Sequence, residues 1–384
     1  MKWLFIISAI IISSAVFAQD STQSKTNKWE INGYIKNMES LYFDKKFNNS
    51  ISGNLLHNRI NFKWKPSEKI TTVAEIRNRL FWGEEVKLTP EFASQLRNEN
   101  EIVNLQQIWI NKTSLVLLSN VERLFVDYQE RNWNLRIGRQ RINWGETITW
   151  NPNDIFNTYN FLDFDYEERP GVDGGKLKYL LNNFSNIEIA YATNGNKDGS
   201  VAAIKYALNK WGYDMQIITG WYYNQPTIGA GWAGNIKEAG FKGEVQYFIP
   251  TQDSLTHLNL TLESDYMFKK GWYVNFGLLF TNQGFYKPVD NWEDIHLKFS
   301  PKNLMPTKWN IMVTTSKQFT PLFTGSMSTV YAPGTNLLII FPTFQYNIDT
   351  NLDITLVWQS FFSRFQNRFQ AGNHSAFLRM KWSF

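Results

Sequence analysis

The sequence predicts an all-β fold, a transmembrane antiparallel β-barrel of about 18 strands, with 16 strands as the alternative count. Three observations predict it. Segments of about ten residues alternate apolar and polar side chains along most of the chain, aromatic residues make up 16% of it, and an apolar segment opens it. A transmembrane barrel uses aromatic side chains as girdles at both membrane interfaces, whereas a soluble domain seldom needs so many.

The N-terminus predicts export from the cytoplasm. A short basic start, Met1-Lys2, precedes the apolar stretch 3–17, and Ala18 ends a small-residue cleavage pattern, so residues 1–18 are interpreted as a cleaved signal peptide. An uncleaved anchor is the alternative, but a spanning helix needs about 20 apolar residues. Residues 19–28 are expected to form a short periplasmic segment. The chain has no cysteine, which excludes a lipoprotein anchor, disulfides and thiolate metal sites.

The C-terminal segment 375–384 is the clearest strand. Its even positions are Ala, Leu, Met, Trp and Phe, and its odd positions include Ser, Arg and Lys. An apolar outside and a charged inside fit a lipid-facing wall around water. The terminal Phe384 resembles the last strand of Gram-negative outer-membrane proteins, which the barrel-assembly machinery reads. We therefore expect a multi-pass barrel in the outer membrane, in contact with its lipid and lipopolysaccharide.

The barrel is expected to fill residues 29–384. Upward strands are predicted over 29–44, 70–83, 133–144, 185–193, 212–222, 238–250, 271–283, 321–332 and 351–363. Downward strands are predicted over 54–66, 121–130, 174–182, 200–208, 228–236, 257–268, 307–318, 336–348 and 373–384. This pairing makes every periplasmic turn short and places the long connections outside, at 84–120, 145–173, 285–306 and 364–372. The strand at 228–236 has the weakest pattern, and omitting it would move the long segment 285–306 into the periplasm.

The stretch RIGRQRINWGE raises the question of where its arginines point. Strict alternation from Trp133 would send Arg139 and Arg141 into lipid, at about 2–4 kcal/mol each near the midplane. Gly138 can adopt the positive φ of a β-bulge, which would flip the phase beyond it and turn both arginines inward. Snorkelling of the long side chains to the interface is the alternative.

These arginines belong to a predicted basic sector of the lumen wall. Its members are Arg59, Lys63, Arg77, Arg79, Arg136, Arg139 and Arg141. The connection 145–173 is acidic and rich in aromatic residues, and we expect it to fold into the lumen opposite this wall. Its acids are Glu146, Asp154, Asp163, Asp165, Glu167 and Glu168. Facing rows of opposite charge would set ion selectivity. The alternatives are a wall that is merely solvated, or loops that plug the pore.

Two motifs resemble a known group of porins. The first is Arg136-x-Gly138-Arg139-Gln140 with Trp144-Gly145, and the second runs from Arg169 to Gly174 as R-P-G-V-D-G. They resemble the G-R-Q … R-x-x-D-G pattern of alginate-export-type and related substrate-selective outer-membrane porins, with a Bacteroidota-like character. The resemblance implies a monomeric barrel of about 18 strands with an electropositive lumen restricted by loops.

Other classes of function find less support. The four histidines, His57, His257, His296 and His374, show neither a nucleophile elbow nor a metal-binding spacing, so we expect no enzyme, metal or cofactor. The net charge is only +5 and the chain has no basic tract, so no nucleic-acid partner is expected. The sequence favours a porin-like channel for passive or substrate-selective diffusion of small hydrophilic solutes, with anions as candidates. The alternative is a non-conducting barrel in surface assembly, adhesion or polysaccharide export.

Overall fold

A computed structural model describes most of the chain. The described residues are 27–97, 101–158, 162–163, 165, 170–196, 199–252, 254–288, 299–365 and 368–384. The predicted signal peptide 1–18 and most of the segment 19–28 lie outside them. No helix in the described part of the chain is long and apolar enough to cross a membrane.

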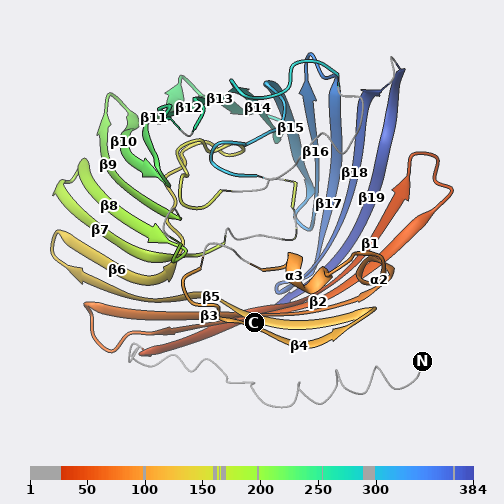
Figure 1. Ribbon diagram of the computed structural model, residues 1–384, viewed down its shortest axis with the longest axis horizontal. Coiled ribbons are helices and arrows are strands. Elements are labelled where there is room, and N and C mark those ends of the chain that lie inside the picture. The colour runs from red at the N-terminus through yellow and green to blue at the C-terminus, as the bar shows by residue number, and fades with distance from the viewer. Residues whose placement is uncertain are drawn as a thin grey trace.

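Antiparallel strands form one closed barrel (Figure 1). In chain order they are β1 (Trp29–Asp44), β2 (Ser50–Trp64), β3 (Ile70–Gly83), β4 (Gln106–Lys112), β5 (Leu115–Glu130), β6 (Trp133–Gln140), β7 (Val172–Asn182), β8 (Ser185–Thr193), β9 (Ser200–Lys210), β10 (Tyr213–Tyr222), β11 (Gln225–Ile236), β12 (Ala239–Phe248), β13 (His257–Met267), β14 (Trp272–Thr281), β15 (Trp309–Thr320), β16 (Phe323–Ala332), β17 (Leu337–Asp349), β18 (Leu352–Phe365) and β19 (Arg368–Ser383). The ring closes where β1 pairs with β19. Strand β4 pairs with β5 alone among the described residues, so 18 strands make the ring.

The predicted barrel of 18 strands is confirmed, including the weakest strand, which is β11. Several strands differ in extent from the prediction, among them the following. Strand β6 ends at Gln140 instead of continuing to 144, β5 begins at Leu115 inside the predicted loop 84–120, and the predicted loop 364–372 belongs mostly to β18 and β19. That last hairpin keeps its ladder to Phe365↔Arg368, because backbone hydrogen bonds between two antiparallel strands can continue beyond the membrane.

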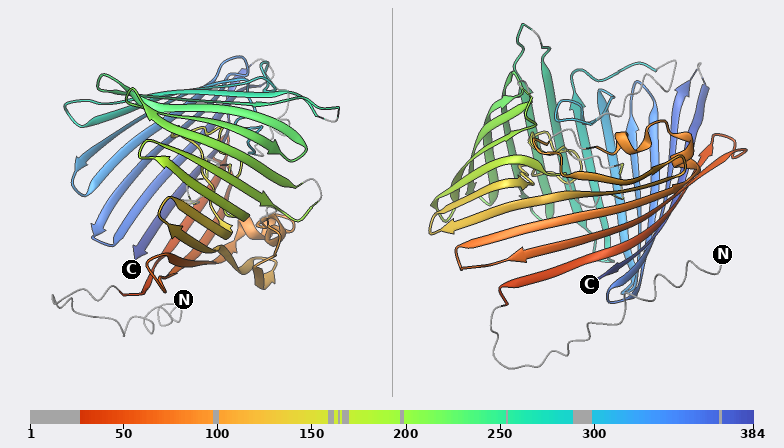
Figure 2. Two further views of the ribbon diagram at one scale, coloured as in Figure 1. Left: turned by 90° about the vertical axis from the view of Figure 1, so that its left-hand side faces the viewer. Right: turned by 60° about the horizontal axis from the view of Figure 1, so that its bottom comes forward.

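The two ends of the barrel differ in their connections (Figure 2). One end carries only short turns, and both Trp29 and the C-terminus lie there. The amide of Phe384 donates to the carbonyl of Gly33 at 2.9 Å, and the amide of Gly33 donates back at 3.0 Å. The other end carries the long connections, so the alternation of short and long connections agrees with the predicted topology.

The long connections fold inward and fill the long-loop half of the barrel. Helices α2 (Glu84–Leu88) and α3 (Phe92–Gln95) pack their buried Val86 and Ala93 on the inward Val116 and Leu118 of β5. A longer segment follows β6, and its described residues 141–158 lie across the interior, as Figure 1 shows. Its Ile142, Trp144, Ile155 and Phe156 form one apolar cluster with inward residues of β7 to β10 and β12. Trp150 joins a second cluster with residues 304–305 and strands β14 to β17.

Candidate functional site

A row of basic side chains lines the inner face of β1, β2 and β3. The ladder places Lys36 opposite His57, His57 opposite Arg79, and Arg59 opposite Arg77, so all five share one face of the sheet. Period-two alternation puts this face toward the interior, where the inward segment covers it. Lys36 is 0% exposed, and the other four are also buried.

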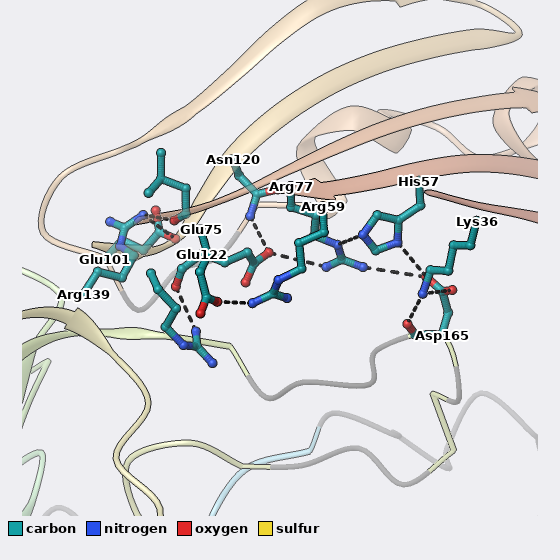
Figure 3. Close-up of polar contacts among 12 residues, drawn as sticks. Lys36, His57, Arg59, Glu75, Arg77, Glu101, Asn120, Glu122, Arg139 and Asp165 are labelled. Carbon is teal, nitrogen blue, oxygen red and sulfur yellow. Dashed lines mark hydrogen bonds and ion pairs between the residues drawn. The ribbon is translucent and has the colours of Figure 1, made fainter. Parts of the chain in front are cut away.

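One carboxylate of the inward segment neutralises the centre of this row (Figure 3). The Asp165 carboxylate forms an ion pair with Lys36 Nζ at 2.7 Å. It also lies 3.7 Å from Arg77 Nη2 and 3.8 Å from His57 Nδ1. Because Arg77 Nε donates to His57 Nε2 at 3.0 Å, the proton of the neutral ring sits on Nδ1, toward Asp165. Burial favours a higher pKa for Asp165, but the neighbouring His57 and the two cations outweigh it and hold that pKa below its usual range.

Wall carboxylates neutralise the flanks of the row. Arg59 pairs with Glu75 of β3. Arg77 Nη1 lies 3.5 Å from Glu122 Oε1 of β5, and Asn120 Nδ2 donates to the same oxygen at 2.5 Å. Glu122 reaches this position because it is the extra residue of an irregularity in β5, between the partners of Glu75 and Ile76. The basic row is therefore a buried ionic network rather than a bare positive surface.

The predicted bulge at Gly138 is wrong, although its positive φ of 121° is confirmed. Strand β6 keeps its register with β5 and β7 from Trp133 to Gln140, and the irregularity lies across the ladder at Glu122. A Cβ on residue 138 would stand 2.2 Å from the carbonyl oxygen of Leu124, so only glycine fits this approach.

Arg139 is buried by pairing rather than by a change of phase. Its Nε donates to Oδ1 of Asp173, its ladder partner on β7, at 2.8 Å, and its Nη1 lies 3.1 Å from Glu101. Its Nη2 donates to the carbonyl of Val103 at 2.6 Å. Arg141 follows the end of β6 and is half-buried in the inward segment. The carboxylates of Asp173 and Glu101 therefore neutralise the Arg139 guanidinium, which strict alternation alone would have left facing lipid without a partner.

A second basic group lies on β6 to β9, and sequence reasoning recognised only its Arg136. Glu188 is surrounded by Lys205 at 3.5 Å, Lys178 at 3.6 Å and Lys176 at 3.9 Å. The Trp144 indole donates to Glu188 at 3.1 Å, which ties the inward segment to this group. Inward alternation of β7 to β9 could have identified these lysines, because each occupies a position of the polar face. Three cations surround one acid here, so this part of the wall is electropositive.

The opposite wall holds the inward segment by its backbone. Glu244 of β12 accepts hydrogen bonds from the amides of Glu146, Thr147 and Asn153 at 2.6–2.8 Å. Glu263 of β13 accepts from the amides of residues 148 and 149 at 2.7 and 2.8 Å. These acids therefore act as acceptors for amides, which fixes the path of the segment across the barrel.

The predicted acids of this segment do not form one row. Asp165 faces the basic wall, while Asp163 is exposed and accepts from the amide of Asp165. Asp154 is buried, and Glu146 lies against Glu244, where burial and that neighbouring charge raise the pKa of Glu146. Glu167 and Glu168 lie outside the described residues. Lys63 is also displaced from the row, since it pairs with Glu30 near the short-turn end.

A cavity of about 680 Å³ opens at the long-loop end between β8 to β10 and the inward segments. Tyr222, Phe156 and Phe299 contribute aromatic walls, and Lys302 lies 5.4 Å above the Tyr222 ring. Burial lowers the pKa of Lys302. Arg97 also lines the cavity, and none of its described lining residues is acidic. Within the described residues, no group of His, Asp or Glu side chains could hold a metal ion.

Solved structures share this fold. The chain is 10% identical to Acinetobacter baumannii OccAB4, with a TM-score of 0.59 over 94% of this chain and 100% of that one. It is 9% identical to Pseudomonas aeruginosa OccK7 (OpdD), with a TM-score of 0.58 over 93% and 99% of the two chains. The outer membrane protein OpdK from Pseudomonas aeruginosa matches at 9% identity and a TM-score of 0.56, over 92% and 98%.

Sequence comparisons place the chain in no family. No protein-family model matches it, and no curated protein matches it. The resemblance to alginate-export-type or Bacteroidota-like porins is therefore not supported, and the two motifs that suggested it reflect the packing of Gly138 and the Arg139–Asp173 pair. The chain has the fold of an outer-membrane β-barrel porin.

Proposed function

We propose that this protein is an outer-membrane channel for small hydrophilic solutes and that it favours anions. The single observation that carries the proposal is the charge asymmetry of the interior, in which lysine and arginine concentrate on β1 to β9 around a segment folded across the barrel. A transmembrane barrel with a polar interior provides an aqueous path, and rings or sectors of one charge select among ions.

The cations that meet water lie toward the short-turn half. Lys63 is 39% exposed, Lys178 35% and Arg136 30%, whereas Arg59 and Arg77 are covered. A positive potential inside a low-dielectric wall raises the local concentration of anions. The water-exposed cations therefore set the preference, and the buried row holds the inward segment in place.

The cavity at the long-loop end supplies an entry site. Lys302 and Arg97 attract an anion, and Tyr222 with Phe299 offers a flat apolar contact. In this orientation the long-loop end faces the outside of the cell and the short turns face the periplasm, as is general for bacterial barrels. Cleavage after Ala18 and delivery to the barrel-assembly machinery through the last strand belong to the same proposal.

Single-channel recording of the refolded protein in a planar bilayer tests this function. We expect stepwise conductance and a reversal potential, under a salt gradient, on the side of anion preference. A cation-selective channel would contradict the preference while leaving the channel in place. Fractionation supplies the second readout, because recovery of the mature chain as a soluble periplasmic protein would contradict the outer-membrane location.

A second function is favoured by the packing of the long-loop half. Two apolar clusters and the buried charge network fill much of that half. A barrel sealed in this way would act in surface assembly, adhesion or polysaccharide export without conducting. Absence of conductance from a folded, heat-modifiable barrel would favour this alternative over the channel.

A further inference from the structure

The outward face of the barrel is apolar along most strands but carries a polar row on β2, β3 and β5. The ladder places Asn58 opposite Asn78, and Asn78 opposite Ser119. Asn78 stands between the outward Ile76 and Leu80 of its own strand. The row therefore lies within the apolar belt and not at its edge.

Hydrogen bonds link the row into a continuous ladder. Asn58 Nδ2 donates to the carbonyl of Tyr34 at 3.2 Å, and Asn78 Nδ2 donates to Asn58 Oδ1 at 3.0 Å. Ser119 Oγ donates to Asn78 Oδ1 at 2.6 Å, and Trp109 Nε1 of β4 donates to Ser119 Oγ at 2.9 Å. These hydrogen bonds join residues of five strands, β1 to β5, so the side chains are held in fixed positions.

The amide groups of Asn58 and Asn78 keep hydrogen-bonding positions that the ladder does not use, and these face outward. An asparagine amide has two N–H donors and an oxygen with two lone pairs, and each Nδ2 of Asn58 and Asn78 makes one hydrogen bond within the described chain. On β1, Asn37 Nδ2 donates to the exposed Glu39, whose carboxylate also faces outward. Hydrocarbon cannot satisfy these groups, so their exposure to lipid is costly.

The described outward residues of the β13–β14 wall form no such row. At comparable outward positions β13 has Leu258, Leu260 and Leu262, and β14 has Val274, Phe276 and Leu278. The row from Asn58 to Ser119 lies on the side of the barrel where β1 to β5 lie together (Figure 1). On the same side, Trp109 of β4 is 64% exposed, and β4 pairs along one edge only within the described residues.

We propose that the outer face of β1, β2, β3 and β5 is an interface with a second copy of this chain, packed wall to wall in the membrane. The face carries its own complement, since one wall holds both the spare amide donors of Asn58 and Asn78 and acceptors such as the Glu39 carboxylate. No outward position of these four strands holds lysine or arginine. A two-fold axis brings the donors of one copy to the acceptors of the other, which is the geometry of a self-complementary contact.

The contact also differs from what the motif resemblance implied, which was a monomer. The interior supports the interface, because the Lys36–Asp165 and Arg77–Glu122 pairs brace the same strands from within. A rigid wall presents its polar row without rearrangement, so less ordering is needed on association.

Single cysteines test the interface, because the chain contains none. Asn78→Cys, treated in native outer membranes with a short membrane-permeant bismaleimide, should give a species of twice the chain mass. Leu262→Cys, at an outward apolar position of the opposite wall, is the matched control and should give at least tenfold less. Equal yields from the two variants, or an adduct of Asn78→Cys with a different protein, would overturn the proposal.

A second variant tests whether the polar row itself makes the contact, or whether the two walls are merely close together. In a Ser119→Cys reporter chain, the change Asn58→Leu with Asn78→Leu should reduce the cross-linked dimer at least fivefold. Both leucines suit a lipid-facing position, and heat-modifiable migration on a gel shows that the barrel is folded. An unchanged dimer yield in this variant would show that the polar row does not make the contact.

Discussion

The two halves of the inner wall use charge in different ways. On β1 to β9, cations concentrate, and Asp165 reaches across from the inward segment to pair with Lys36 and Arg77 beside the neutral His57. On β12 and β13, Glu244 and Glu263 instead accept the backbone amides of the same segment. One half binds the segment by its side chain and the other by its backbone.

This difference explains why the interior can be both ordered and selective. Backbone amides make strong charge-assisted hydrogen bonds with a buried carboxylate and fix the path of the segment. A side-chain ion pair fixes a single point and leaves the neighbouring cations of the wall, such as Lys178 and Arg136, facing water. Anchoring and selectivity are thus carried by opposite walls.

The largest loss of stability is expected on removing Glu244, the carboxylate that accepts the backbone amides of the inward segment. Glu244→Leu leaves the amides of Glu146, Thr147 and Asn153 without their acceptor, at about 1–3 kcal/mol for each unsatisfied group. We expect the free energy of unfolding in urea to fall by about 3 kcal/mol or more. Glu238→Leu, in an exposed turn, is the control and should change it by less than about 0.5 kcal/mol. Equal effects of the two variants would show that Glu244 does not anchor the segment.

Breaking the ionic anchor should have a similar or slightly smaller effect. Asp165→Asn leaves the buried Lys36 and Arg77 without their shared counter-charge, and such a loss costs about 3–5 kcal/mol when no water enters. Because Asp165 is 12% exposed, we expect about 3 kcal/mol, measured by denaturant unfolding. Asp349→Asn, at the exposed end of β17, is the matched control. If Asp165→Asn is as stable as the wild type, Asp165 does not anchor the inward segment to the basic row.

The pH dependence sharpens the role of Asp165. Its pKa is lowered in the folded protein, so its contribution is complete above the unfolded pKa of about 3.9 and is lost as pH falls toward the folded value. We expect the stability difference between wild type and Asp165→Asn to stay constant from about pH 8 to pH 5 and to shrink below about pH 4. A difference that shrinks near neutral pH would assign the stabilisation to another group.

The smallest effect concerns selectivity and leaves the fold intact. Reversing Arg136 and Lys178 to glutamate changes exposed charges, each worth about 1 kcal/mol at 4 Å in water, or about a fivefold change in ion preference. We expect the reversal potential to move toward cations. Lys242→Glu, on β12 and 26% exposed, should move it less. An unchanged reversal potential in the double variant would remove these cations from the ion path.

The sequence alone determined the barrel and its strand count. Lipid outside and water inside impose a period of two on every strand, so β11 and the C-terminal strand could be identified from their alternation. The inward fold of residues 145–158 could also be predicted, because a long connection carrying Trp150 and Phe156 is poorly suited to water. Lys36, Lys176 and Lys205 occupy polar positions of their strands, and the same alternation could have included them.

Only the tertiary structure decided which charges meet. Arg139 needed no change of phase, because Asp173 is its ladder partner and Glu101 comes from a distant segment. Asp165 rather than Asp154 faces the basic wall, and Glu244 accepts amides that no pattern reveals. Strand β4 and the outward row from Asn58 to Ser119 depend on register between strands. Periodicity fixes which face a side chain takes, whereas its partner depends on how distant strands and loops are brought together.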